Sequence, residues 1–112
     1  MGFLVERGRL LALATLAAAA AVLAEDTRIT KRLLAHYGIT TPLLTYNDHS
    51  SEAVRERMIH RLREGEALAL VSDAGTPLVS DPGYRLVQAA IAAGLPVTPI
   101  PGPSAMLTAL VV

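Results

Sequence analysis

The stretch that most constrains the fold runs from Ala67 to Ala105, where short apolar segments alternate with loops rich in glycine and proline. Its first segment, Ala67–Ser72, is apolar without alternation, which is typical of a strand covered on both faces of a parallel sheet. The eleven residues Asp73–Gly83 follow, with two glycines and two prolines. Neither a helix nor a strand is expected to continue through such a composition, so we predict a loop here.

A helix and a second strand are predicted after this loop. The helix is expected over Tyr84–Ala93 and ends at Gly94, which suits the left-handed position after a helix. Its inward face is predicted to carry Leu86, Val87, Ala90 and Ile91. Pro96–Pro101 predicts the next strand, and Gly102–Ser104 is expected to open a further helix, with Pro103 in its first turn. A strand, a short helix and a strand in this order indicate a right-handed parallel crossover.

The two loops of this unit are the best candidate site in the sequence. In a parallel crossover, Asp73–Gly83 and Pro101–Ser104 both leave the carboxyl ends of their strands, so they lie at one edge of the sheet. Ligands of open α/β sheets bind at that edge. The first loop is also long for a simple connection, which favours a binding site over a tight turn.

The segment Leu10–Ala24 is almost entirely apolar and rich in alanine. It is too short to span a bilayer comfortably, which leaves two interpretations. It is either a buried helix that runs into a short strand at Val22–Ala24, or a secretory signal with Arg7 and Arg9 as a weakly basic start. Composition alone does not separate them, because alanine favours a helix in both settings. The second interpretation would make the chain a small secreted binding domain.

Polar residues follow each predicted strand. Glu25–Arg28 comes after Val22–Ala24, and Thr27 is expected to cap a helix over Thr30–Tyr37 with Leu33 and Leu34 inward. Pro42–Tyr46 predicts another strand, and Asn47, Asp48 and His49 follow it. Helix capping and turn chemistry explain any one of these clusters, but their repetition at four strand ends indicates a functional edge.

An amphipathic helix is predicted over Ser50–Glu64, with an apolar stripe formed by Val54, Met58, Ile59 and Leu62. Its opposite face carries glutamates and arginines, including Arg55 and Arg63. Such a face is more often solvated than bound to RNA phosphate.

Composition excludes several classes of protein. The formal net charge is zero and there is no cysteine, so there is no global field for nucleic acid and no disulfide or thiolate chemistry. The three histidines, His36, His49 and His60, show no metal-ligand spacing, so no metal is expected.

The chain resembles the tetrapyrrole methylase superfamily, and within it the enzymes that methylate a cytidine 2′-hydroxyl of small-subunit ribosomal RNA. The resemblance rests on AEDTR at 24–28, TYNDHS at 45–50, LVSDAGTPLVSDPGYRLV at 70–87 and PVTPIPGPSA at 96–105. The long third motif is the most specific. The alternative within the superfamily is an enzyme that methylates a tetrapyrrole precursor. EDTR and the third motif resemble the ribosomal RNA enzymes more than these tetrapyrrole enzymes.

The resemblance implies an α/β fold, with a mostly parallel sheet and helices on both faces, and S-adenosylmethionine as methyl donor without a metal. It implies that the donor is held by Ser72, Asp73, Ala74, Gly75, Thr76 and Pro77 in the loop 72–83 and by Pro101, Gly102, Pro103, Ser104 and Ala105 in the loop 101–105. It also implies a cytoplasmic homodimer that binds small-subunit ribosomal RNA and no membrane.

The resemblance begins near Leu10, so residues 1–9 form an atypical N-terminus and residues 10–112 a partial N-terminal methylase domain. Family members start with a strand and a glycine-containing loop and continue into a second α/β domain. Neither feature is found in this sequence. We therefore expect a fragment that lacks the first strand and the C-terminal domain.

Ribose methylation needs a group that removes the hydroxyl proton, and a carboxylate within hydrogen-bond reach is a suitable base. The carboxylates expected at the edge are Glu25, Asp26, Asp73 and Asp81. Asp73 has the simpler role of binding the donor, and Asp81 that of capping the following helix. Arg28 and Lys31 are candidates for RNA phosphate; a surface ion pair with Glu25 or Asp26 is the alternative.

Overall fold

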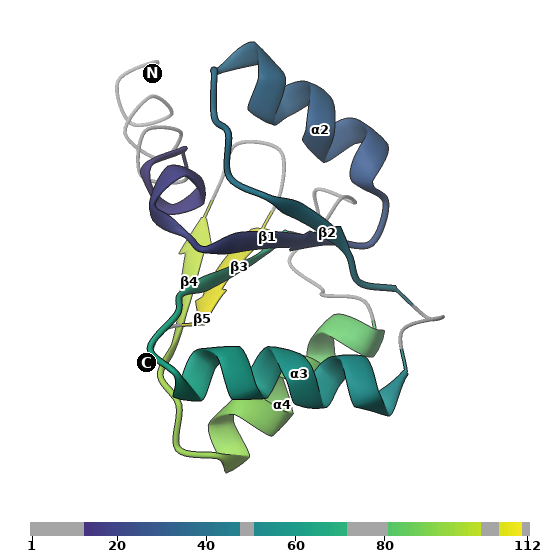
Figure 1. The fold of residues 1–112 in the computed structure, drawn as a ribbon, viewed down its shortest axis with the longest axis vertical. Coiled ribbons are helices and arrows are strands. Elements are labelled where there is room, and N and C mark those ends of the chain that lie inside the picture. Colours follow the sequence, from purple (N-terminus) through teal and green to yellow (C-terminus); the bar gives the residue numbers. More distant parts are fainter. Residues whose placement is uncertain (1–12, 48–50, 72–80, 102–105, 111–112) are drawn as a thin grey trace.

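The computed structural model describes residues 13–47, 51–71, 81–101 and 106–110. After a helical segment at 13–18, the elements follow in the order β1 (Ala21–Ala24), α2 (Thr27–His36), β2 (Leu43–Thr45), α3 (Glu52–Arg63), β3 (Leu68–Val71), α4 (Asp81–Ala92), β4 (Val97–Pro101) and β5 (Met106–Leu110). These strands form one sheet in the order β2-β1-β3-β5-β4 (Figure 1).

The fold is α/β and its sheet is mostly parallel, as the sequence predicts. β1 lies between β2 and β3 and is parallel to both, with Val22 opposite Leu43 on one side and opposite Ala69 on the other. All four residues of β1 and all four of β3 are buried. Apolar strands without alternation occur where both faces of a sheet are covered, and this is the environment of β1 and β3.

Strand β5 corrects the prediction for the C-terminal segment. Residues 106–110 form an antiparallel strand between β3 and β4, where a helix opened by Gly102–Ser104 was expected to continue. Residues 106–110 pair with β3 on one side and β4 on the other, and these backbone hydrogen bonds stabilise a strand more than the local helix propensity stabilises a helix. β3 and β4 are therefore parallel to each other, as predicted for the crossover, but they are not neighbours.

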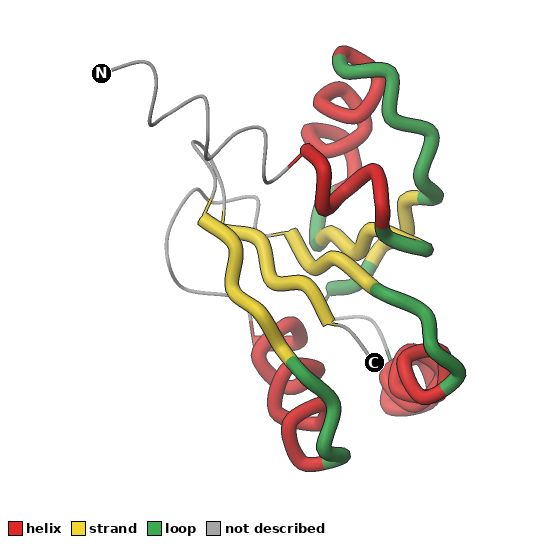
Figure 2. The backbone as a smooth tube through the Cα atoms, turned by 90° about the vertical axis from the view of Figure 1, so that its left-hand side faces the viewer, coloured by secondary structure: helices red, strands yellow, loops and turns green. Residues whose placement is uncertain are grey.

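Helices cover both faces of the sheet (Figure 1 and Figure 2). On one face, Ala21 and Leu23 of β1 and Leu68 and Leu70 of β3 pack in one core with α3 and α4, which contribute Met58, Leu62, Leu86 and Ala90. On the other face, Val22 of β1 and Ala69 and Val71 of β3 pack with Leu16 and with Leu34 of α2. Successive residues of each strand thus serve opposite cores.

The segment 13–24 belongs to the fold, which contradicts the signal interpretation. Its last four residues form the inner strand β1, which starts one residue earlier than predicted, and Leu16 is buried in one of the two cores. The hydroxyl of Thr41 donates a hydrogen bond of 2.8 Å to the carbonyl of Leu16 and fixes the helical segment against the approach to β2. Within the described part of the chain, no helix is long and apolar enough to cross a membrane.

Three details of the helices differ from the predictions. α2 begins at Thr27 with Asp26 as its N-cap, so Thr27 is not the cap. α4 begins at Asp81, three residues earlier than predicted, because a proline is tolerated in the first turn, where its missing N–H is not needed. Ile91 was placed on the inward face, yet it is 61% exposed. The buried stripe of α4 runs through Leu86 and Ala90, and the residue after Ala90 is turned away from it.

Gly38 ends α2 in a left-handed conformation, with φ of 67°. The N–H of Gly38 donates to the carbonyl of Ala35 and that of Ile39 to the carbonyl of Leu34, which satisfies carbonyls left free at the helix end. Gly65 and Gly94, after α3 and α4, also have positive φ, and for Gly94 this conformation was predicted.

Replacing Gly38 by alanine is expected to lower the free energy of unfolding by about 1 kcal/mol, because a Cβ disfavours this conformation. No atom lies within 4 Å of the position that the Cβ would take, so the cost comes from the backbone. Urea denaturation measures the change. Gly38→Asn is the matched control and is expected to lose less, since asparagine tolerates positive φ. Equal stability of Gly38→Ala and the wild type would contradict this account of the helix end.

Candidate functional site

The carboxyl ends of four strands lie at one edge of the sheet. The register places Ala24, the last residue of β1, opposite both Thr45 of β2 and Val71 of β3. Val71 is in turn opposite Leu107 of β5, and Pro101, the last residue of β4, is opposite Met106. The carboxyl ends of β1, β2, β3 and β4 therefore lie at this edge, as the strand and loop pattern predicts.

The loops expected to hold the donor lie largely outside the described residues. Residues 72–80 and 102–105 are not described, so the positions of Ser72, Asp73, Ala74, Gly75, Thr76, Pro77 and Gly102, Pro103, Ser104, Ala105 are not given by the structure. What the structure gives is their anchors. Val71 and Pro101 stand on either side of the first residues of β5. Adjacent strands are about 4.8 Å apart, so the two loops start about 10 Å from each other.

Asp26 and Arg28 form a bidentate ion pair next to the end of β1. The Asp26 carboxylate accepts a hydrogen bond of 3.0 Å from the backbone N–H of Arg28, and the guanidinium donates to it from Nε at 3.0 Å and from Nη2 at 2.7 Å. The side-chain hydrogen bond from Arg28 lowers the pKa of Asp26 to about 2. The carboxylate is therefore ionised at neutral pH and already serves as helix cap and as partner of a cation.

This pairing bears on two predicted roles. Arg28 was a candidate for RNA phosphate, and the structure has the alternative, a surface ion pair with Asp26. Lys31, the second candidate, is exposed on the next turn of α2 and forms no ion pair with a described residue. Glu25 is exposed directly after β1. Asp81 is the first residue of α4, so it belongs to the helix it was expected to cap.

A pocket of about 500 Å³ opens between the ends of β1 and β2 and the helix α3. We call it the β2–α3 pocket, and it is lined by Leu23, Leu44, Thr45, Asn47, Arg57 and Met58. Tyr46 also lines it and is buried, and its backbone N–H donates to the carbonyl of Ala24 at 2.8 Å. Burial raises the pKa of the Tyr46 phenol.

Sequence reasoning did not single out Tyr46 or Arg57 for this site. TYNDHS was part of the resemblance, but a tyrosine after a strand has no pattern that distinguishes a pocket wall from a surface residue. Arg57 was one of several arginines on the predicted α3 face. Only the packing of α3 against the sheet brings it to the strand ends.

A mostly parallel sheet with helices on both faces and strand ends gathered at one edge defines an α/β domain, and ligands of open α/β sheets bind at that edge. The chain belongs to the family of tetrapyrrole (corrin/porphyrin) methylases, whose profile matches residues 10–112.

Relatives of known name are similar over most of this chain. "Ribosomal RNA small subunit methyltransferase I" of Xylella fastidiosa is 62% identical over 89 residues, which are 80% of this chain and 33% of that protein. The proteins of the same name from Halalkalibacterium halodurans and Escherichia coli O157:H7 are 52% and 50% identical over 89% and 88% of this chain. The aligned part is 35% of each of these two proteins. The chain thus spans about a third of the length of these relatives.

The carboxyl of Asp26 is expected to titrate with a midpoint near 2 in a ¹³C NMR pH titration. Because folding lowers this pKa, the interaction stabilises the protein above the ordinary pKa and is lost as the pH falls towards 2. Arg28→Gln is expected to raise the midpoint towards 3.8, the ordinary value. The control Arg32→Gln removes an exposed cation from the same helix and is expected to leave the midpoint unchanged. An unchanged midpoint in Arg28→Gln would refute the role of this ion pair.

Proposed function

We propose that this chain forms the donor-binding part of an S-adenosylmethionine-dependent enzyme that methylates the 2′-hydroxyl of a cytidine in small-subunit ribosomal RNA. The observation that carries the proposal is the convergence of the strand ends Ala24, Val71 and Pro101 at one edge, in a chain whose relatives are named ribosomal RNA methyltransferases. Those names favour the RNA substrate over a tetrapyrrole precursor.

The donor would be held by the loops anchored at Val71 and Pro101. We assign this role to residues 72–77 and 101–105, with Gly75 and Gly102 allowing the backbone to approach the ligand closely. The anchors fit such a ligand because they are fixed by the sheet and open towards the same edge. When bound, S-adenosylmethionine supplies a methyl group on a positively charged sulfur, so the protein contributes mainly alignment of the ribose oxygen with that group.

The proton of the ribose hydroxyl requires a base, and the geometry argues against Asp26. A carboxylate with a pKa of about 2 is a weak base, and its oxygens already accept hydrogen bonds from Arg28. We therefore propose Glu25, Asp73 or Asp81 for this step and assign Asp26 a structural role at the start of α2.

The remaining parts of the proposal concern partners. Lys31 is the better candidate for RNA phosphate, because Arg28 is occupied by Asp26. A homodimer in the cytoplasm that needs no metal follows from the resemblance and belongs to the same proposal.

Calorimetric titration of the purified chain with S-adenosylhomocysteine, the demethylated product of the donor, tests the donor site. Saturable binding of one ligand per chain is expected. Asp73→Ala and Gly75→Val are expected to weaken the affinity roughly tenfold, the effect of losing one hydrogen bond to a charged group or of obstructing the loop backbone. Their circular dichroism spectra should match that of the wild type.

Arg32→Gln, an exposed residue on α2 that the donor site does not include, is the matched control and is expected to bind the product as the wild type does. Binding that is unchanged in both Asp73→Ala and Gly75→Val would show that the donor site is elsewhere. Absence of binding to the wild-type chain would refute the proposal that these loops alone form the donor site.

A further inference from the structure

The β2–α3 pocket combines an apolar floor with a polar rim. Leu23, Leu44 and Met58 come from three different elements and form the floor, and Thr45, Asn47 and Arg57 stand around it. Its volume of about 500 Å³ lies within the range of small-molecule sites, roughly 300–1,000 Å³. The pocket lies where β1 and β2 end, so it shares the edge from which the donor loops leave.

Arg57 is the cation of this pocket and makes no ion pair with any described residue. Its neighbours on α3 are engaged: Arg55 pairs with Glu52 at 3.6 Å, and Arg61 donates to Glu66 from Nε at 3.0 Å and from Nη2 at 2.9 Å. Arg57 itself is exposed. Its guanidinium is therefore available to an anion from solution, whereas that of Arg61 is already held by a carboxylate.

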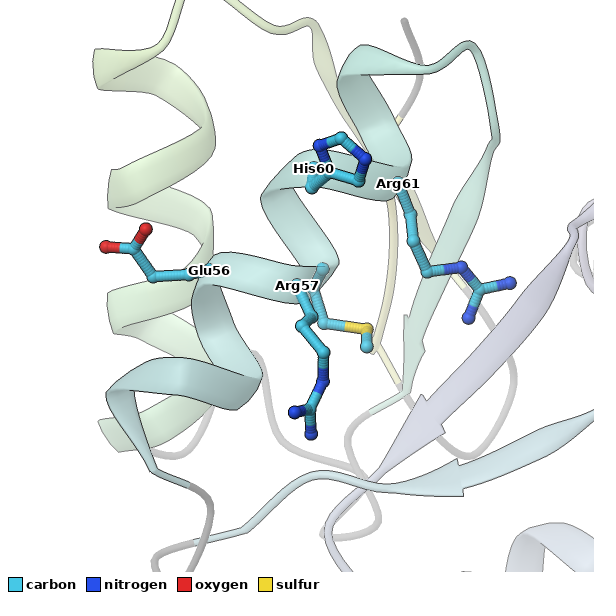
Figure 3. A pocket seen from close by; sticks show the side chains of 5 residues that line it. Glu56, Arg57, His60 and Arg61 are labelled. Atoms are coloured by element: carbon cyan, nitrogen blue, oxygen red, sulfur yellow. The ribbon is translucent and has the colours of Figure 1, made fainter.

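The orientation of these side chains supports this distinction. Figure 3 shows Arg57 and Arg61 extending from one side of α3, while Glu56 extends from the other side, towards α4. Residues 57 and 61 are four apart and so share a helix face. Glu56 lines the space between α3 and α4 with Arg63 and also a shallow pocket on α3 with Arg57, and it does not line the β2–α3 pocket. The lining of the β2–α3 pocket thus includes Arg57 and no carboxylate among the described residues.

We propose that the β2–α3 pocket seats one nucleotide of a single-stranded RNA, with Arg57 binding its phosphate and the apolar floor packing against its sugar or base. This inference rests on the proposed function, because it takes the occupant to be a segment of the RNA substrate near the methylated nucleotide. A planar guanidinium binds phosphate oxygens with two parallel hydrogen bonds, and the exposed Thr45 supplies a hydroxyl for the sugar or the base edge. Tyr46 is buried, so it forms a wall and offers no face for stacking.

Fluorescence anisotropy with a labelled single-stranded RNA decanucleotide of mixed sequence tests the phosphate contact in the full chain. Arg57→Gln is expected to weaken binding roughly tenfold, since hydrogen bonds to charged groups are lost. It is also expected to reduce the slope of log K against log salt by about 0.7, the value for one phosphate of a single strand.

Two further variants separate the pocket from general charge. Arg63→Gln removes an exposed α3 cation that also lacks an ion pair among the described residues but lies towards α4, so it is expected to leave the affinity and the slope nearly unchanged. Thr45→Trp fills the pocket from its exposed rim and is expected to weaken binding without changing the salt slope. Circular dichroism confirms that each variant is folded.

Three outcomes would overturn the inference. Equal losses in Arg57→Gln and Arg63→Gln would indicate diffuse charge attraction. Failure of the wild-type chain to bind the RNA would show that the pocket is no RNA site in this chain. A change of sedimentation coefficient in Arg57→Gln would assign the pocket to contact with a second copy. Titration of the same variants with S-adenosylhomocysteine distinguishes these results from failure of the proposed function, because Arg57 lies outside the proposed donor site.

Discussion

The rest of the structure depends on the burial of β1 between two parallel neighbours and under helices on both faces. Its four residues are almost inaccessible to solvent, and they connect the two cores, to which β3 also contributes buried residues. Fully burying a leucine or valine stabilises a protein by about 1.5–3 kcal/mol, and Val22 and Leu23 do this in opposite directions. A strand so placed has little freedom in register, because a slip by one residue would send each side chain into the wrong core.

That fixed register determines where function can reside. Parallel strands bring their carboxyl ends together, so polar residues that are far apart in the chain meet at one edge. Asp26 and Arg28 use part of this edge for a helix cap and an ion pair. The β2–α3 pocket and the anchors of the two loops use the remainder. One edge therefore contains both a cation held in an ion pair, Arg28, and a cation without an ion pair to any described residue, Arg57.

Much of this architecture could be predicted from the sequence because it follows from local patterns. Apolar runs predicted β1 to β4, and Gly94 predicted the end of α4. The inward residues Met58 and Leu62 of α3 were also correct. The errors arose where non-local contacts decide the outcome. β5 is a strand because β3 and β4 pair with it on either side, and nothing within residues 106–110 signals those partners. The N-cap of α2 is Asp26 rather than Thr27, because the Asp26 carboxylate accepts the hydrogen bond from the Arg28 N–H, which only the structure shows. Arg57 could be distinguished from the other arginines of α3 only once the ion-pair partners of those arginines were known.

The place of β5 also determines how the sheet can assemble. Within the described residues β4 pairs with β5 alone, so β4 has no direct partner among the strands that precede it. β1, β2 and β3 can form a parallel sheet by themselves, whereas β4 can join the sheet only through β5, which follows it in the chain. Two antiparallel strands joined by a few residues form a hairpin in microseconds, faster than distant strands find one another. We therefore expect the β4–β5 hairpin and the parallel strands β1, β2 and β3 to form separately and then to pair through β3 and β5. In a chain that ends before residue 106, β4 would have no strand to pair with.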